Sequence, residues 1–370
     1  MTTTGTDSGR IRLGTRGSRL ALTQSGQVAE ALMAAGAPGE GSGARRDGLD
    51  IDLVTVRTDG DGDRTPLRQL GGVGVFAARL RHALLDGEVD LVVHSFKDLP
   101  TQPVEGLEVI CVPPREDPHD ALCARDGLTL ATLPEGARVG TGSPRRAAQL
   151  LAARPDLEVV DLRGNVPTRL ARVRGLEAVG VGTDEPVAPA RADAAGDLDA
   201  VVLALSGLRR LGLEHCASEV LDLETMLPAP AQGALAVEAR AGEDSAELAR
   251  AVAALDDEPT RLAVTAERAL MARLGAGCAA PVGAWAHLRG GEQEQRVLVL
   301  RAVVTSLDGG QEVGCELSTE LPEASGGPGA PGNTAAVRAA EALGARAAEV
   351  LLEDGADQIV DLHANKPRRD

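Results

Sequence analysis

Aromatic side chains are scarce in this chain of 370 residues, which holds one Trp, two Phe and no Tyr. So few rings argue against a protein that stacks bases along a nucleic acid or lines a sugar site with tryptophan. Basic residues are also in deficit, since 38 Lys and Arg stand against 55 Asp and Glu and leave a net charge of -17. A general nucleic-acid binder must neutralise phosphates, so we expect no nucleic-acid partner.

Long apolar runs and paired cysteines are lacking as well. No apolar run reaches membrane-spanning length, so we expect no membrane partner. The opening residues MTTTGTDSGR lack the apolar core of a secretion signal, which favours a cytoplasmic protein. The cysteines are odd in number and form no C-x-x-C pair, which argues against a disulfide framework and a zinc knuckle. The six histidines lack H-E-x-x-H spacing, and we expect no metal.

The first half alternates short apolar segments with amphipathic helical stretches, a pattern typical of an α/β fold with a mostly parallel sheet. Strands are predicted at residues 11–13, 89–93, 157–162 and 198–205, each followed by a turn with small or basic residues. A further turn at 140–144 precedes a helix to about Ala153. A helix start beside small residues and Arg forms a site for anions. Ordinary helix capping is the alternative at any single junction.

The second half differs in pattern after about Asp256. It predicts a helix over 260–274, a glycine-rich turn around Cys278, strands around 297–304 and a helix over 334–352. This arrangement indicates a separate small α+β domain, consistent with a length that predicts two or three domains. Residues 177–197 are rich in Gly, Ala, Pro and Asp and are interpreted as a surface insertion, and 323–333 as a second loose stretch.

Charged residues directly follow one apolar strand in the segment HSFKDLP, which runs from His94 to Pro100. In α/β folds ligands bind at the carboxyl ends of strands, and a carboxylate there can transfer protons. A Lys-Asp pair that caps a loop is the alternative. A G-x-G-x-x-A match over residues 72–77 suggests a dinucleotide site, but the preceding residues do not form a convincing strand.

Taken together, these segments resemble the porphobilinogen deaminase family, whose members are also called hydroxymethylbilane synthases. The resemblance covers residue 11 to about residue 286 with few gaps and continues more loosely to the end. It is carried by TRGSRLALTQ, GGVGVF, HSFKDLP, REDPHDAL, GTGSPRRAAQL, LRGNVPTRL, LSGLRRLGL, LPAPAQGALAVEAR and TAERALMARLGAGCAAPVG.

The resemblance implies three domains. Two α/β domains like those of periplasmic binding proteins flank a cleft, and a small α+β C-terminal domain carries the cofactor-bearing cysteine. The chain of such proteins crosses back into the first domain, so residues 1–113 with 228–251 would form domain 1. Residues 114–227 would form domain 2, and residues 252–370 domain 3.

The implied reaction condenses four porphobilinogen molecules head to tail with loss of ammonia, then releases linear hydroxymethylbilane by hydrolysis, as in tetrapyrrole and haem biosynthesis. By resemblance, Cys278 forms a thioether to a dipyrromethane cofactor, and a thiol is a strong nucleophile toward the azafulvene formed from porphobilinogen. Asp98 matches the catalytic aspartate. It can aid protonation of the leaving amine, stabilise the cationic azafulvene and accept the proton lost after carbon–carbon bond formation. A monomer is expected.

The same resemblance implies a set of binding residues for the acetate and propionate groups of the pyrroles. The cofactor would contact Ser95, Lys97, Thr141, Ser143, Arg145, Arg146, Arg163 and Gly164. Substrate would contact Arg16, Ser18, Phe76, Arg169, Arg210 and Gln232. An arginine can hold a carboxylate in two contacts. Arg209 is either a further binding residue or a solvated helix charge, and Gln69 and Val73 stand where many bacterial relatives have lysines.

Two other functions remain open at this point. A non-catalytic small-polyanion binding protein on the same two-domain fold would need only the arginines at the helix starts. A dinucleotide oxidoreductase would bind nicotinamide at residues 72–77. Asp98 and Cys278 separate the enzyme from both. The other cysteines, at 111, 123, 216 and 315, are interpreted as small buried residues.

Overall fold

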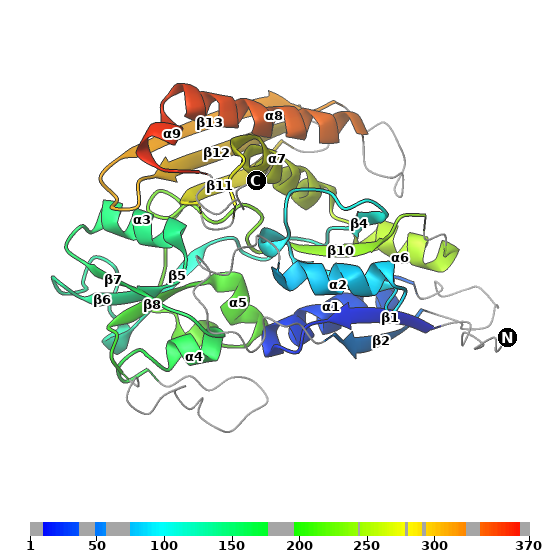
Figure 1. The fold of residues 1–370 in the computed structure, drawn as a ribbon, viewed down its shortest axis with the longest axis horizontal. Coiled ribbons are helices and arrows are strands. Elements are labelled where there is room, and N and C mark those ends of the chain that lie inside the picture. Colours follow the sequence, from blue (N-terminus) through cyan, green and yellow to red (C-terminus); the bar gives the residue numbers. More distant parts are fainter. Residues whose placement is uncertain are drawn as a thin grey trace, which may run out of the picture.

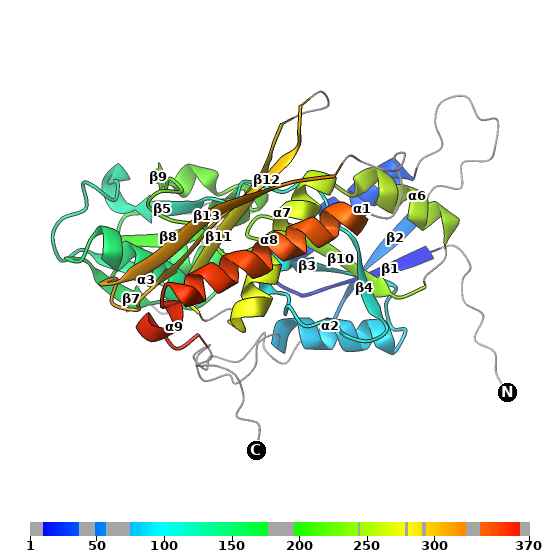
Figure 2. The same ribbon diagram turned by 90° about the horizontal axis from the view of Figure 1, so that it is seen from above.

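The computed structural model describes residues 10–36, 49–56, 75–176, 196–242, 245–277, 280–290, 294–322 and 334–362, without the side chains of residues 75, 76 and 334. Two α/β units lie side by side, and a third, helix-covered sheet lies above them in Figure 1. The same three units are seen from above in Figure 2. The expected fold class of two α/β domains and a small α+β domain is confirmed.

The first sheet has the strand order β2-β1-β3-β10-β4. Its strands are β1 (Arg10–Thr15), β2 (Asp50–Thr55), β3 (Leu91–Ser95), β4 (Leu107–Cys111) and β10 (Leu235–Arg240). β1 pairs in parallel with β2 and β3, whereas β10 is antiparallel to β3 and β4. The helices that pack on this unit are α1 (Arg19–Ala35), α2 (Val75–Leu85) and α6 (Ala246–Leu255).

The second sheet repeats this plan with the order β7-β6-β8-β5-β9. Its strands are β5 (Asp120–Ala124), β6 (Arg138–Thr141), β7 (Glu158–Asp161), β8 (Ala200–Ala204) and β9 (Glu219–Val220). Its helices are α3 (Pro144–Ala153), α4 (Val166–Leu170) and α5 (Leu205–Arg210). β6 is parallel to β7 and β8, and β5 is antiparallel to β8. In each sheet the antiparallel strand, β5 or β10, is the first strand after the chain crosses from the other sheet.

The third unit is an antiparallel meander of β11 (Val282–Arg289), β12 (Val297–Thr305) and β13 (Glu312–Glu320). The helices α7 (Glu258–Leu274) and α8 (Thr334–Glu353) cover one face of this sheet, and α9 (Ala356–Ile359) follows. Their shared core is built from Ala, Leu and Val, as the scarcity of aromatic residues requires. Three short 3-10 helices, η2 (Phe96–Asp98), η3 (Arg125–Gly127) and η4 (Glu214–Cys216), complete the described elements.

Several element boundaries follow from local sequence. Asp257 caps α7 by accepting a hydrogen bond from the Thr260 amide at 2.9 Å, and Gly275 ends the helix in the left-handed conformation. The strand boundaries differ from the sequence prediction by one or two residues, for example in β3 and β8. β3 pairs from Leu91 rather than from residue 89, and β8 ends at Ala204 because Leu205 begins α5.

The two loose segments predicted from composition, 177–197 and 323–333, lie almost wholly outside the described residues. No helix within the described ranges is long and apolar enough to cross a bilayer.

Candidate active site

A short 3-10 helix, η2, presents Asp98 directly beyond the carboxyl end of β3. The side chain of Asp98 is exposed, whereas its neighbours Phe96 and Leu99 are buried and fix the loop to the core. Ser95 donates a hydrogen bond from its hydroxyl to Oε1 of Gln24 at 3.1 Å. The loop is therefore anchored on both sides of a carboxylate that faces solvent.

Lys97, beside Asp98, points toward the second α/β unit. The pKa of Lys97 is lowered to about 8, chiefly by burial and also by the positive charges of Arg146 and Arg145, while the negative charges of Asp98 and Asp120 oppose the change. Lys97 of the first unit thus lies in the electrostatic field of three charged residues of the second unit.

Gln232 joins the two α/β units. Its side chain is fully buried, and its Oε1 accepts hydrogen bonds from Lys97 Nζ at 3.3 Å and from Arg146 Nη2 at 3.4 Å. Its Nε2 donates to Oδ1 of Asp120 at 2.8 Å and to the carbonyl of Pro118 at 2.7 Å. All its polar atoms are used inside the protein, so Gln232 orders the cationic side chains around it.

Arg145 and Arg146, at the start of α3, share one buried carboxylate. Asp120 is fully buried and accepts from Arg145 Nη2 at 2.7 Å and from Arg146 Nε and Nη2 at 3.0 and 2.7 Å. Burial alone would raise the pKa of Asp120, but the charges and hydrogen bonds of the two arginines hold it well below its usual range.

The structure places Arg145 deeper than the sequence suggests. Its Nη1 donates to the carbonyl of Leu227 at 2.5 Å and its Nη2 is taken by Asp120, and the residue is only 3% exposed. Both terminal nitrogens thus have protein partners. This arrangement ties α3 to the segment by which the chain returns to the first unit.

Arg163, Gly164 and Arg169 lie in the turn and helix that follow β7. Arg169 Nε donates to the carbonyl of Gly164 at 2.8 Å, a contact that the left-handed Gly164 backbone (φ 113°) allows. The pKa of Arg169 is lowered to about 10, chiefly by burial and also by the charges of Arg146 and Arg163. Asp161 and Asp98 oppose this change. Arg169, repelled by both Arg146 and Arg163 and with Asp98 close by, makes a site suited to an anion.

Thr141, Gly142 and Ser143 form the neighbouring turn between β6 and α3. A Cβ at Gly142 would lie 2.4 Å from the carbonyl oxygen of Leu162, so only glycine lets this turn pack against the turn after β7. Oγ1 of Thr141 accepts from the Ser143 amide at 3.2 Å, while the Ser143 side chain makes no capping hydrogen bond to α3. The Ser143 hydroxyl therefore remains available to a ligand at the start of α3.

The remaining candidates lie at the start of α1 and at the end of α5. Arg16 directly follows β1 and is half-buried, and Ser18 caps α1 by accepting from the Ala21 amide at 3.3 Å. Arg210 donates from Nη2 to the carbonyl of Gly233 at 2.7 Å, and burial lowers its pKa. Arg209 is exposed and pairs with Glu116 at 2.9 Å, which fits a solvated helix charge.

Cys278 and the loop residues Gln69 and Val73 lie outside the described residues, as does the side chain of Phe76. The other cysteines are free thiols. Cys111, Cys123 and Cys216 are buried as predicted, whereas Cys315 is half-buried. Burial raises the pKa of Cys111 and Cys123 to about 12 and that of Cys315 to about 11, so these three thiols are poor nucleophiles at neutral pH. No cluster of metal-ligating side chains occurs in the described ranges.

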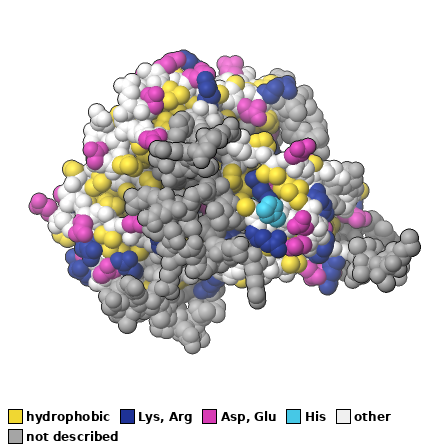
Figure 3. All heavy atoms as spheres, in the orientation of Figure 1, with side chains coloured by type: hydrophobic (Ala, Val, Ile, Leu, Met, Phe, Trp, Pro, Cys, Tyr) yellow, Lys and Arg dark blue, Asp and Glu magenta, His cyan; other side chains and the backbone are white. Residues whose placement is uncertain are grey.

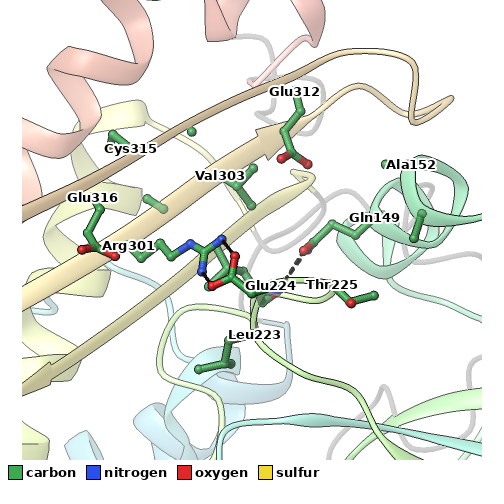
Figure 4. Close-up of a pocket in the computed structure, with 14 residues that line it drawn as sticks. Gln149, Ala152, Leu223, Glu224, Thr225, Arg301, Val303, Glu312, Cys315 and Glu316 are labelled. Atoms are coloured by element: carbon green, nitrogen blue, oxygen red, sulfur yellow. Dashed lines mark hydrogen bonds and ion pairs between the residues drawn. The ribbon is translucent and has the colours of Figure 1, made fainter.

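An open cavity of about 530 Å³ lies away from the candidate site residues (Figure 4). It is formed between α3 and the face of β12 and β13 that α7 and α8 do not cover. Arg301 and Glu224 form an ion pair across it, with an Nη2–Oε2 distance of 2.6 Å, and Gln149 accepts a hydrogen bond from the Leu227 amide. Glu312 and Glu316 add negative charge. The arginines expected to bind carboxylates do not line it, so it is separate from the candidate active site.

The charge of the protein is unevenly distributed. On the face shown in Figure 3, acidic side chains are spread over the surface with basic ones among them. The arginines after β6 and β7 instead form a local positive region beside Asp98. An overall charge of -17 therefore coexists with a small cationic site.

Four charged residues with hydrogen bonds near the candidate site were not singled out from the sequence: Arg115, Asp120, Glu267 and Arg268. Arg115 and Asp120 belong to the REDPHDAL segment, and Glu267 and Arg268 to TAERALMARLGAG. Only Glu267 could have been recognised from the sequence. It is a carboxylate at helical spacing from Ala263, Leu270 and Leu274, which predicts a buried charge on the apolar face of α7. Its partners come from distant segments, which a sequence pattern does not reveal.

Comparison with known proteins places the chain among enzymes of one type. Residues 11–248 match the family described as "Porphobilinogen deaminase, dipyromethane cofactor binding domain", and residues 261–353 match "Porphobilinogen deaminase, C-terminal domain". The porphobilinogen deaminase of Cutibacterium acnes is 52% identical over 362 residues, which are 97% of this chain and 99% of that protein. Those of Micrococcus luteus and Thermobifida fusca are 51% and 49% identical, over 97% and 94% of this chain and 98% and 95% of theirs.

Solved structures give a weaker likeness. A TRAP periplasmic solute binding protein from Roseobacter denitrificans, with bound β-D-glucuronate, is 10% identical and covers 67% of this chain and 78% of its own, at a TM-score of 0.32. A likeness this low carries no argument about fold or function.

Proposed function

The chain belongs to the porphobilinogen deaminase family, and from that premise we propose how its own residues perform the reaction. The protein is a transferase that condenses four porphobilinogen molecules head to tail with loss of ammonia and releases linear hydroxymethylbilane by hydrolysis. The observation that carries the proposal is the placement of the exposed carboxylate of Asp98 beside Lys97 and the arginines of the second unit.

The residues present fit a dipyrromethane, the cofactor of this family. Burial, together with repulsion by Arg146 and Arg163, lowers the pKa of Arg169. Acetate and propionate side chains would relieve that repulsion through charge-assisted hydrogen bonds. When bound, the cofactor supplies the pyrrole end to which the substrate is joined.

Asp98 serves as the catalytic residue in this proposal. Its carboxyl group can aid protonation of the leaving amine. Its carboxylate can stabilise a cationic azafulvene through the pyrrole N–H. It can then accept the proton that leaves when the new carbon–carbon bond forms. The anchored backbone on both sides of Asp98 keeps its carboxylate in place through successive cycles.

The binding residues divide into two groups. Lys97, Ser143, Arg163 and Arg169 face the cofactor and growing chain, together with Arg16 before α1 and Arg210 at the end of α5. Gln232 and Asp120 support them from within, as does Arg145, whose two terminal nitrogens are bonded to Leu227 and Asp120. Arg146 belongs to both groups, since it pairs with Asp120 and also repels Arg169. Thr141, Gly164, Ser95 and Ser18 shape the turns that carry these side chains.

Cys278 is the proposed attachment point of the cofactor. It follows the end of α7 by four positions, and the raised pKa values of Cys111, Cys123 and Cys315 argue against those thiols as alternatives. We also propose the domain division 1–113 with 228–251, 114–227 and 252–370. A monomer is proposed as well, and a cytoplasmic location because the described cysteines are free thiols.

Turnover tests this function. The purified protein is incubated with porphobilinogen while ammonia and hydroxymethylbilane are measured. We expect four molecules of porphobilinogen consumed and four of ammonia released for each hydroxymethylbilane. Binding of porphobilinogen without release of ammonia would instead support the non-catalytic anion-binding alternative, which no comparison favours.

A further inference from the structure

Arg268 of α7 reaches from the third unit into the catalytic loop of the first. Its Nη1 donates to the carbonyls of Phe96 at 3.2 Å and Leu99 at 2.7 Å, and its Nη2 donates to the carbonyl of Pro100 at 2.8 Å. The guanidinium carbon also lies 4.4 Å from the centroid of the Phe96 ring. One side chain thus makes three hydrogen bonds and a cation–π contact with a single loop.

Arg268 contacts residues that lie before and after Asp98 in the sequence. Phe96 lies two positions before Asp98 and Leu99 directly after it, and both carbonyls are held by the same nitrogen of Arg268. These three hydrogen bonds go to backbone carbonyls, so Arg268 constrains the backbone from which the carboxylate of Asp98 projects. A planar guanidinium with several fixed donors suits this task better than a flexible ammonium.

Other contacts hold the loop less directly. The Phe96 amide donates to the carbonyl of Ala234 at 3.0 Å, and Phe96 and Leu99 pack against Val264 of α7 and Ala234. These interactions secure the start of the loop and its apolar side. The carbonyls of Leu99 and Pro100, which follow Asp98, depend on Arg268. Removal of Arg268 would therefore loosen the part of the loop that determines where Asp98 points.

The same helix leads to the proposed cofactor cysteine. α7 continues from Arg268 to Leu274, a rise of about 9 Å at 1.5 Å per residue, and Cys278 follows four positions later. A helix transmits position well because its backbone is fully hydrogen-bonded. A contact made at Arg268 therefore sets the catalytic loop relative to the helix from whose end the cofactor cysteine extends.

We propose that Arg268 is a positioning residue of the condensation reaction: it fixes the loop of Asp98 to α7, so that the catalytic carboxylate and the cofactor-bearing turn share one support. The inference rests on the proposed function. It predicts that loss of Arg268 lowers the rate of each condensation step without weakening the binding of porphobilinogen, because the arginines that bind carboxylates lie elsewhere.

The test compares Arg268→Met and Arg268→Lys with two control variants on the same helix. Arg273→Met removes an exposed arginine whose pairing with Glu349 is 3.4 Å long. Arg261→Met removes a half-buried arginine that bonds Asp256 and the carbonyl of Ile110, and so breaks a contact between the same two units without touching the loop. Melting temperature, covalent pyrrole content, kcat per pyrrole-bearing molecule and KM are measured for each.

Arg268→Met is expected to lower kcat about 10- to 100-fold with unchanged KM, because a shift of about 1 Å in a catalytic group can cost about 100-fold. Arg268→Lys should recover part of this loss. The two controls should retain the parental kcat. Equal kcat for Arg268→Met and Arg261→Met at similar melting temperatures would overturn the proposal, as would a loss in Arg268→Met confined to KM. If Arg268→Met does not fold, Arg268→Lys carries the test, and a parental kcat in that variant overturns the proposal.

Hydrogen exchange provides a readout that is independent of turnover. Arg268→Met should raise amide exchange at residues 96–101 more than at the rest of β3 and α7, and Arg261→Met should not. Unchanged exchange in the loop would overturn the inference. If the parental protein releases no ammonia from porphobilinogen, the proposed function fails, and the exchange comparison still decides whether Arg268 holds the loop.

Discussion

The buried carboxylate of Glu267 on α7 accepts two hydrogen bonds from Arg115, at 2.7 and 3.1 Å. Arg115 lies where the chain first crosses between the α/β units. Glu267 also accepts from the amide of Ala231, on the returning crossing, at 2.5 Å, and from the amide of Ala286 in β11 at 2.7 Å. One fully buried side chain therefore joins both crossings to the third unit.

Glu267→Gln is expected to destabilise the protein by about 3–5 kcal/mol, because the change leaves the charge of Arg115 buried without its partner. Urea unfolding measures the difference. Glu349→Gln, which alters an exposed pair with Arg273 on the adjoining helix surface, should cost about 0–1 kcal/mol. Similar losses in the two variants would show that the junction at Glu267 contributes no more than a surface pair.

Asp120→Asn should also destabilise the protein, and the effect should depend on pH. Asp120 has a lowered pKa in the folded state, so its contribution is present above the pKa of the unfolded chain and is lost as the pH falls below it. The difference in unfolding free energy between parent and variant should therefore be constant near neutrality and shrink below about pH 4. A difference that grows on acidification would contradict this account of the Arg145–Asp120–Arg146 cluster.

Because of Lys97, the free energy of unfolding should depend on pH above neutrality. Its folded pKa of about 8 lies below the ordinary value of 10.5, so between these values the unfolded chain binds more protons than the folded one. The contribution of Lys97 to stability should rise with pH through this window. Unfolding at several pH values, in a Cys278→Ser background without cofactor carboxylates, should show this rise, and Lys97→Met should lack it. The same slope in both proteins would assign the rise to another group.

Asp98→Asn is expected to fold normally and to lose about 10²- to 10⁴-fold in turnover, the range for removal of a group that transfers protons. The carboxylate is exposed, so the substitution disturbs no core contact. Circular dichroism and melting temperature check the fold, and ammonia release measures turnover. Near-normal turnover in the folded variant would refute the catalytic role of Asp98.

Regular elements with local signals could be predicted from the sequence. The helix expected over 260–274 is α7 (Glu258–Leu274), because Asp257 supplies a cap and Gly275 a left-handed end. The helix expected over 334–352 is α8 (Thr334–Glu353), and the strand expected at 297–304 is β12 (Val297–Thr305). In these segments local propensity and tertiary packing favour the same conformation.

The partners of the charged residues could not be predicted in the same way. Arg145 and Arg146 stand side by side in a recognisable segment, but their common partner Asp120 approaches only when β5 pairs with β8. The contact of Arg268 with Leu99 joins residues 169 positions apart. A sequence pattern identifies a charge at a helix start, whereas the fold decides whether that charge faces a ligand or a buried carboxylate.

The central claim is that this chain is a condensing enzyme primed by a covalent dipyrromethane on Cys278, and intact mass spectrometry of the denatured protein tests it most directly. The account predicts a mass above that of the sequence by two linked pyrrole units, and the unmodified mass in Cys278→Ser. An unmodified mass in parental protein that also fails to release ammonia from porphobilinogen would contradict the account, as would an adduct that persists in Cys278→Ser.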